Sequence, residues 1–300
     1  MRRALKWAGV VVGALVVLFV SSQLVLRMIG QSRLNARYTV DATLPPDVVA
    51  NASAAMGEKI AITRGCTDCH AAGAAGKVFL DIPPGVIVAP NLTKGRGGVG
   101  ARYATADDWN RAIRFGIRPD STTITTFMPW WFFNRLSDAD VAAVAAYMAS
   151  APPVDNALPP TRLRQIGYVM MGLPSGNPTA RRASLLRSRS DPSPGPTAAY
   201  GRYIASTACV GCHGDDMLGG WHHDPNGPAA PGLSHVGAWA TSEFIKALRT
   251  GEVPGGRRLS DWMPWKKFAL FTDEELTALH EYLKTVRPTK AVSGSSIRSE

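Results

Sequence analysis

The four cysteines of this 300-residue chain belong to two copies of one pentapeptide, Cys66-Thr67-Asp68-Cys69-His70 and Cys209-Val210-Gly211-Cys212-His213. The pattern C-x-x-C-H is that of covalent c-type haem attachment. Each thiol can bond one vinyl group of a haem, and the histidine that follows can offer a ring nitrogen to the iron. The sequence therefore predicts two covalently bound c-type haems, with these attachment points and iron ligands: Cys66, Cys69, Cys209, Cys212, His70 and His213.

Two other kinds of cysteine site share part of this pattern. A structural zinc site needs four ligands close together, whereas more than a hundred residues separate Cys69 from Cys209. A thioredoxin-like redox pair needs no histidine after the second cysteine. Because both copies carry that histidine, the sequence favours haem attachment over either alternative.

A haem iron held by one histidine has a sixth position to fill. Met128 follows His70 and Met263 follows His213 at similar separations along the chain. Methionine usually packs in a core, but here Met-Pro-Trp recurs at 128–130 and 263–265. We therefore predict Met128 and Met263 as the second axial ligands, a ligation that raises the reduction potential.

The remaining histidines and methionines have less specific settings. His235 is an alternative ligand in the second half, and we expect His222, His223 and His280 at the surface. Met56, Met148 and Met217 are expected to pack.

A ligand histidine also needs its other ring nitrogen hydrogen-bonded. Pro90 begins a Pro-Asn-Leu segment downstream of His70, and Pro231 begins a Pro-Gly-Leu segment at a similar separation from His213. We expect a backbone carbonyl of each segment to accept that bond, although an ordinary turn would explain the same pattern.

The two halves of the chain are an internal repeat. From Trp109 to Tyr147 the first half matches the second at a constant offset of 135 positions, without a gap. Ser137 and Thr272 each precede an acid by three positions, which predicts the N-cap of a final helix. A short helix that contains Gly57 or Gly201 is expected before each haem motif, and the final helix is expected to pack over it. These glycines could permit a close helix crossing or could simply begin a helix.

The N-terminus reads as a membrane segment. A basic start precedes an apolar run from Trp7 to Leu26, and 20 helical residues span about 30 Å, the thickness of a bilayer's hydrocarbon core. We expect a retained anchor over 1–29, and a cleaved signal peptide is the alternative. Because c-type haem is attached outside the cytoplasmic membrane, we expect a single-pass protein with its haem domains in the periplasm.

The predicted fold class is all-α, with two tandem haem domains after one transmembrane helix. The expected boundaries follow in chain order: anchor 1–29, tether 30–50, first haem domain 51–151, proline-rich linker 152–198, second haem domain 199–287 and tail 288–300. We expect the apolar middle of the linker, 166–173, to pack across the interface between the two domains.

The net charge of +10 does not indicate a nucleic-acid partner. Residues 51–151 carry a net +2 and residues 199–287 a net −1. The excess lies in 1–50 and 152–198, with +4 each. This excess reads as solvated basic chain, or as attraction to anionic lipid headgroups.

At these residues the chain resembles the class I cytochromes c, over roughly 50–151 and 198–286. In that family a C-x-x-C-H site is followed by a Pro-x-Leu turn and by a methionine before a C-terminal helix. The resemblance implies that Pro90 and Pro231 support the axial histidines. Gly201-Arg202-Tyr203-Ile204 and Leu248-Arg249-Thr250-Gly251 are similar to multi-haem cytochrome subunits of periplasmic dehydrogenases that oxidise alcohols, sugar acids or aromatic heterocycles.

We therefore expect an electron carrier rather than an enzyme. Its donor would be a membrane or periplasmic dehydrogenase or a quinol-oxidising protein, and its acceptor a terminal oxidase or a soluble cytochrome. A diheme peroxidase or thiosulfate-oxidising cytochrome is one alternative, and it needs an iron that opens or an unusual ligand. A haem subunit of a cbb3-like oxidase is the other alternative.

Overall fold

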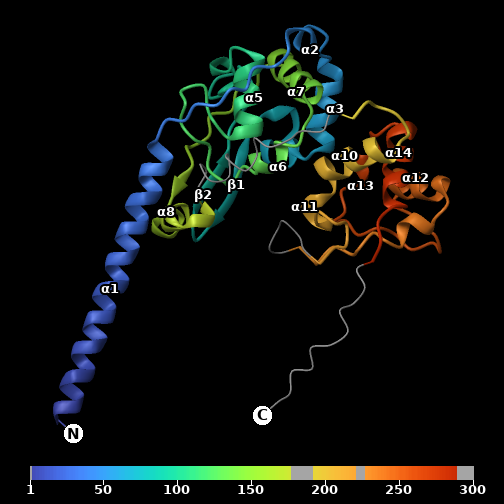
Figure 1. Cartoon of the computed structure of the whole chain (residues 1–300). Coiled ribbons are helices and arrows are strands. Elements are labelled where there is room, and N and C mark those ends of the chain that lie inside the picture. Colours follow the sequence, from blue (N-terminus) through green and yellow to red (C-terminus); the bar gives the residue numbers. More distant parts are fainter. Residues whose placement is uncertain (1, 177–191, 221–226, 289–300) are drawn as a thin grey trace, which may run out of the picture. The chain divides into compact units, whose positions relative to one another are not determined.

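The computed structural model of the chain describes residues 2–176, 192–220 and 227–288. The chain forms two compact units, Met1–Arg189 and Ser190–Glu300. Helices make up most of the described structure (Figure 1), and a long apolar helix begins the chain, so the predicted all-α class is confirmed.

The helices of the two units repeat at the offset seen in the sequence. α5 (Ala106–Phe115) and α12 (Thr241–Thr250) begin and end 135 positions apart, as do α6 (Trp130–Phe133) and α13 (Trp265–Phe268). α7 (Asp138–Ser150) and α14 (Asp273–Leu283) begin 135 positions apart. Before them, α3 (Ala54–Thr63) and α10 (Ala198–Ala208) lead into the haem-motif helices α4 (Cys66–His70) and α11 (Val210–His213). The sequence repeat is therefore a repeat of whole helices.

Each unit is built on a close helix crossing at a glycine. A Cβ on Gly57 of α3 would lie 1.9 Å from the Ala143 carbonyl oxygen of α7, and one on Gly201 of α10 would lie 1.8 Å from that of Ala278 on α14. Such distances exclude any side chain, so these glycines permit the close crossing. The expected packing of the final helix over the glycine-bearing helix is confirmed.

The predicted N-caps of the final helices are also confirmed. The Ser137 hydroxyl accepts a hydrogen bond from the backbone N–H of Asp140 at 3.0 Å. The Thr272 hydroxyl accepts from the Glu275 N–H at 3.1 Å, and the Glu275 carboxylate accepts from the Thr272 N–H at 2.7 Å. These bonds satisfy donors that a helix start would otherwise leave unpaired.

The first unit contains a small sheet that the sequence analysis missed. β1 (Lys77–Ile82), β2 (Gly85–Ala89) and β3 (Arg162–Leu163) are antiparallel in the order β1-β2-β3. The sequence did contain a signal for β1 and β2: two short runs that contain valine and isoleucine flank Pro83-Pro84, which is typical of a hairpin. The third strand could not be found in this way, because it comes from the linker.

The segment 30–50, expected to be a tether, is docked on the first unit. The Leu44 N–H donates to the Asp107 carboxylate at 2.9 Å, and the Asn110 side chain donates to the Ala42 carbonyl at 2.6 Å. Ala42 packs with the buried Phe115. The short helix α2 (Pro46–Ala50) then follows and begins with proline, whose fixed φ suits a first helical position.

The first part of the linker also belongs to the first unit. The Asn91 side chain donates to the Val154 carbonyl at 2.6 Å, and that of Asn156 donates to the Ala75 carbonyl at 2.8 Å. Chain on both sides of the predicted first haem domain thus contacts it. Short 3-10 turns complete the described structure: η1 (Ala72–Ala74), η2 (Gly100–Arg102), η3 (Pro174–Gly176) and η4 (Val236–Ala238).

The N-terminal helix α1 (Arg2–Asn35) continues past the predicted end of the anchor at residue 29. Its most apolar 18-residue window has a mean hydropathy of 2.4, and the helix is long and apolar enough to cross a membrane. The middle of the linker forms α8 (Gln165–Gly172), which lies beside α1 (Figure 1). That stretch is therefore helical, and within its own unit it packs on α1.

Candidate functional site

Both haem motifs form a single helical turn directly after a longer helix. In the first unit Gly65 separates α3 from α4 and has φ of +80°, a conformation that favours glycine. Residues three apart in a helix share a face, so Cys66 and Cys69 lie on one face of α4. None of the four cysteines forms a disulfide, so each sulfur can take part in a covalent bond to a cofactor.

Each motif histidine is oriented by a proline carbonyl. His70 Nδ1 lies 2.9 Å from the Pro90 carbonyl oxygen, and His213 Nδ1 lies 2.8 Å from that of Pro231. A carbonyl only accepts hydrogen bonds, so Nδ1 carries the proton in each ring. Nε2 then keeps its lone pair, which is the state a metal requires.

The loops that carry these carbonyls are held in the same way in both units. The Leu92 N–H donates to the Ala74 carbonyl at 2.8 Å, and the Leu233 N–H donates to the Met217 carbonyl at 2.8 Å. Ala74 and Met217 have φ of 58° and 60°. The same unusual turn therefore positions both proline segments against their histidines.

Burial sets the protonation of the first motif. It lowers the pKa of His70 below its usual value, and the hydrogen bond to Pro90 partly offsets the effect. Burial raises the pKa of the Cys69 thiol, which Lys77 opposes. The histidine is thus neutral at physiological pH, the form in which imidazole binds iron.

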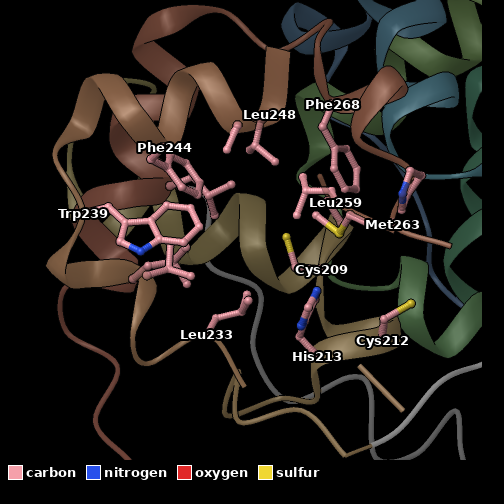
Figure 2. Close-up of a pocket in the computed structure, with 16 residues that line it drawn as sticks. Cys209, Cys212, His213, Leu233, Trp239, Phe244, Leu248, Leu259, Met263 and Phe268 are labelled. Carbon is pink, nitrogen blue, oxygen red and sulfur yellow. The ribbon is translucent and has the colours of Figure 1, made fainter. Parts of the chain in front are cut away.

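Next to its haem motif the second unit contains a cavity that is partly open, with an empty volume of about 690 Å³ when the space open to solvent is counted. Figure 2 shows the side chains of Cys209 and His213, from the haem motif, and of Met263, from the loop before α13, converging on this cavity. The remaining walls are apolar and include Leu233, Trp239, Phe244, Leu248, Leu259, Phe268, Leu279 and Leu283.

These residues fit a c-type haem. The donor set comprises two thiols, an imidazole and a thioether, which are the groups that attach and ligate such a haem. The apolar walls suit the faces of a porphyrin, since cofactor sites are lined mostly by hydrophobic and aromatic side chains. Sequence-predicted Cys209, Cys212, His213 and Met263 all line this one cavity.

The first unit has apolar residues at the matching positions. Trp109, Ile113, Phe133, Val144 and Met148 stand 135 positions before Phe244, Leu248, Phe268, Leu279 and Leu283. Cys66 packs on the cluster that contains Trp109, and Met128 packs on a second cluster that contains Phe133. Ile113 contacts both clusters. The structure thus places Cys66 and Met128 on neighbouring parts of one core, while Met128 as an iron ligand stays a prediction.

An arginine–aspartate pair braces each unit, and the sequence analysis did not assign it a role. Arg114 of α5 lies 2.5 Å from Asp138 and donates to the Leu136 carbonyl at 2.6 Å. Arg249 of α12 lies 2.8 Å from Asp273. The sequence did contain a signal for this pair, because both the arginines and the aspartates recur at the offset of 135 positions. Each pair fixes the start of the final helix, ten residues after the candidate methionine ligand.

The structure corrects part of the assignment of the other histidines. His280 is fully buried rather than at the surface. Its ring stacks on Phe244 at 5.0 Å and contacts the Thr241 hydroxyl at 3.1 Å and the Val236 carbonyl at 3.2 Å. His235 is exposed and meets Trp239 edge to face at 5.9 Å. His222 and His223 lie outside the described residues.

The packing assigned to the other methionines holds for two of three. Met148 and Met217 are buried, as expected. Met56 is 44% exposed, so its expected packing is wrong. Within the described parts of the chain, no three His, Cys, Asp or Glu side chains lie together in a group that could hold a metal ion.

Comparison with known families gives one description for both units. A family model described as "Cytochrome c" matches residues 54–152 and 198–287. The two matches cover the two sets of repeated helices and both C-x-x-C-H motifs.

Curated relatives extend the likeness over most of the chain. The fructose dehydrogenase cytochrome subunit of Gluconobacter japonicus is 29% identical over 82% of this chain and 54% of its own length. The cytochrome c subunit of the quinone alcohol dehydrogenase of Gluconacetobacter polyoxogenes is 29% identical over 80% and 57%. The gluconate 2-dehydrogenase cytochrome c subunit of Pantoea cypripedii is 24% identical over 82% and 62%. The chain thus spans somewhat over half the length of these relatives.

Proposed function

The chain belongs to the cytochrome c family, and from this we propose that it is a membrane-anchored diheme cytochrome that carries single electrons away from a dehydrogenase. Its cofactor is c-type haem, and its class of function is electron transfer, as in the cytochrome subunits it resembles. The observation that carries the proposal is the repeated pairing of a motif histidine with a proline carbonyl in two matching units.

The residues proposed to hold the haems are those of the two motifs and the two methionines. Cys66 and Cys69, and likewise Cys209 and Cys212, would form the thioether bonds. A bound haem would supply a one-electron iron couple. His70 and His213 would each present Nε2 to the iron, and the carbonyls of Pro90 and Pro231 would hold the rings in place.

Met128 and Met263 would fill the remaining axial positions. A thioether ligand is soft and raises the reduction potential, which suits a carrier that passes electrons onward to a strong acceptor. In the second unit the walls around His213 and Met263 are apolar, which would limit the contact of a bound iron with water. With both axial positions filled by side chains, neither iron would offer a position to a substrate.

The proposed electron donor is the catalytic subunit of a dehydrogenase. The relatives named above are cytochrome subunits of fructose, alcohol and gluconate dehydrogenases. Because this chain covers somewhat over half of their length, its partner and that partner's substrate are part of the proposal. A terminal oxidase or a soluble cytochrome would be the acceptor.

The proposed location is the outer face of the cytoplasmic membrane, with α1 as the anchor. Arg2, Arg3 and Lys6 precede the apolar run, but Arg27, Arg33 and Arg37 follow it, so the charges on the two sides differ little. The proposed orientation therefore rests on the haem motifs: c-type haem is attached outside the cytoplasmic membrane, which would put both C-x-x-C-H motifs in the periplasm and the N-terminus in the cytoplasm.

Spectroscopy of the purified full-length protein tests the haem assignment. We expect two haems per chain, both low-spin in electron paramagnetic resonance of the oxidised form. A high-spin five-coordinate haem would contradict the carrier assignment and favour an enzyme.

Purification in mild detergent tests the assignment of a donor. We expect a flavin, quinone-cofactor or molybdenum dehydrogenase to co-purify and to reduce both haems when its substrate is added. Co-purification of a copper–haem oxidase with no dehydrogenase would instead place the chain in an oxidase.

A further inference from the structure

Helix α8 exposes an apolar face on the first unit. Gly167 and Met171 are buried on one side. Ile166, Met170 and Leu173 are 52%, 41% and 38% exposed, and their spacing places them together on the other side. The helix sequence QIGYVMMG contains no charged residue. A surface helix of a soluble domain would normally present polar or charged side chains there.

This helix crosses α1 closely, with glycines on both partners. A Cβ on Gly30 would lie 2.0 Å from the Tyr168 carbonyl oxygen, and one on Gly172 would lie 2.0 Å from that of Leu26. Residue numbers rise along α8 as they fall along α1, so the two helices are antiparallel. The C-terminal end of α8 therefore lies next to Leu26.

Leu26 is the last residue of the apolar run of α1. The run from Trp7 to Leu26 spans about 30 Å as a helix, which equals the hydrocarbon thickness of a bilayer. The end of α8 is thus at the level where hydrocarbon gives way to headgroups. Met28 and Ile29 of α1 are 69% and 38% exposed, so apolar surface continues on α1 at the level of α8.

The last backbone carbonyls of α8 accept hydrogen bonds from a side chain and do not depend on water for them. Arg33 of α1 places Nη1 at 2.8, 2.9 and 2.8 Å from the carbonyl oxygens of Met171, Gly172 and Leu173. These are carbonyls that a helix end leaves unpaired, and unpaired carbonyls are costly where water is scarce. At the opposite end, which is farther from the apolar run, Arg164 pairs with Asp81 at 2.8 Å.

We infer that α8 lies in the boundary between headgroups and acyl chains, with Ile166, Met170 and Leu173 facing lipid. The inference rests on the proposed anchoring by α1 and adds a second membrane contact. α8 is also joined to the body of the first unit. A Cβ on Gly167 would lie 2.2 Å from the Pro84 carbonyl oxygen, and the Thr126 hydroxyl lies 3.7 Å from the Met171 sulfur. The contact therefore fixes which face of the first unit meets the membrane.

Depth measurements with spin labels test this placement. The full-length haem-loaded protein, reconstituted in phosphatidylcholine nanodiscs, carries one new cysteine at position 166, 170 or 173. The native cysteines are bonded to haem, and the unsubstituted protein checks that they take no label. Val16→Cys in the apolar run is the lipid reference, and Met56→Cys, 44% exposed on α3, is the water reference. Collisions with oxygen and with a water-soluble nickel chelate report depth, and haem spectra confirm the fold.

We expect all three α8 labels to show an oxygen-to-nickel collision ratio severalfold above that at position 56, highest at 173 and below that at 16. If position 16 reads as lipid while 166, 170 and 173 match position 56, the inference fails and the anchor stands. If position 16 itself reads as water, the anchor and the inference fail together.

Discussion

The same arginine–aspartate pair is much less exposed to solvent in the first unit than in the second. In the first unit the Arg114 side chain has no exposed surface and that of Asp138 is 23% exposed. In the second unit Arg249 is 32% and Asp273 76% exposed. Leu44, from the segment before the first haem domain, packs with Leu136 of the same corner in the first unit. Sequence positions that match across a repeat can therefore contribute very different energies, because what covers them differs.

The haem ligands are where the two units should agree most closely, and replacing them should have the largest effect. We expect Met128→Leu and Met263→Leu each to lower the reduction potential of one haem by a sizeable part of the roughly 0.8 V range that axial ligation covers. Leucine conserves volume, so packing changes little. Redox titration followed by absorbance measures both potentials in each variant. If Met128→Leu leaves both potentials unchanged, Met128 is not a ligand and the units differ at their centre.

Removing the arginine of the arginine–aspartate pair should destabilise the first unit much more than the second. We expect Arg114→Met to cost about 3–5 kcal/mol, because it removes the buried partner of Asp138. Arg249→Met should cost about 0–1 kcal/mol, since that pair is solvated. Hydrogen exchange resolved by peptide measures the opening of α7 and α14 separately. A loss of about 3 kcal/mol would speed exchange of α7 by roughly a hundredfold. Equal effects in the two units would show that burial does not distinguish the pairs.

Adding a side chain at the glycine of the close helix crossing should destabilise both units to a similar degree. We expect Gly57→Ala and Gly201→Ala each to destabilise by about 1–3 kcal/mol, because the new Cβ overlaps a backbone carbonyl of the final helix. Alanine at an open helical position would instead stabilise by up to about 1 kcal/mol. Chemical denaturation followed by haem absorbance measures the loss. The neighbouring exposed changes Glu58→Ala and Arg202→Ala are the matched controls, and we expect them to change little. A stabilised Gly57→Ala variant would contradict the close crossing.

A pH effect from His280, which has no counterpart in the first unit, is the smallest difference we expect. Burial lowers the pKa of His280 from its usual value of 6.5, with the hydrogen bond to Val236 opposing the shift. The unfolded chain then binds the proton more readily, so stability contributed by neutral His280 is complete above about pH 6.5 and is lost as pH falls below it. The slope is at most about 1.4 kcal/mol per pH unit for one proton.

The first unit has Ala145 at the matching position of the repeat and should lack this contribution. Denaturation of the wild type and of His280→Gln at pH 7.5 and 5.5 isolates the effect. The wild type should lose more stability than the variant on acidification. An identical loss in both proteins would remove His280 as its cause.

Much of the candidate site could be predicted from the sequence because its chemistry is local. C-x-x-C-H places both thiols and the histidine within one helical turn, and nothing distant is needed to recognise it. The ungapped offset from Trp109 to Tyr147 likewise predicted matching helices, and Ser137 and Thr272, each three positions before an acid, predicted the caps of the final ones. The role of Gly57 and Gly201 stayed open until the structure showed the close crossings. The hairpin at Pro83-Pro84 is local in the same sense, because both strands adjoin its turn, whereas β3 pairs from a distant segment.

Other features depended on contacts between distant parts of the chain. His280 looked like a surface residue on an amphipathic helix, and only its stacking on Phe244 shows that it is buried. No local pattern predicts contacts between residues that lie far apart in the chain. Such contacts bury Arg114, dock the segment 30–50 on the first unit and hold α8 against α1. The sequence by itself determined the cofactor, the repeat and the apolar N-terminal segment, since each can be recognised from the order of residues along the chain. Only the tertiary structure decided which matching residues are buried, because burial depends on what the rest of the chain lays over them.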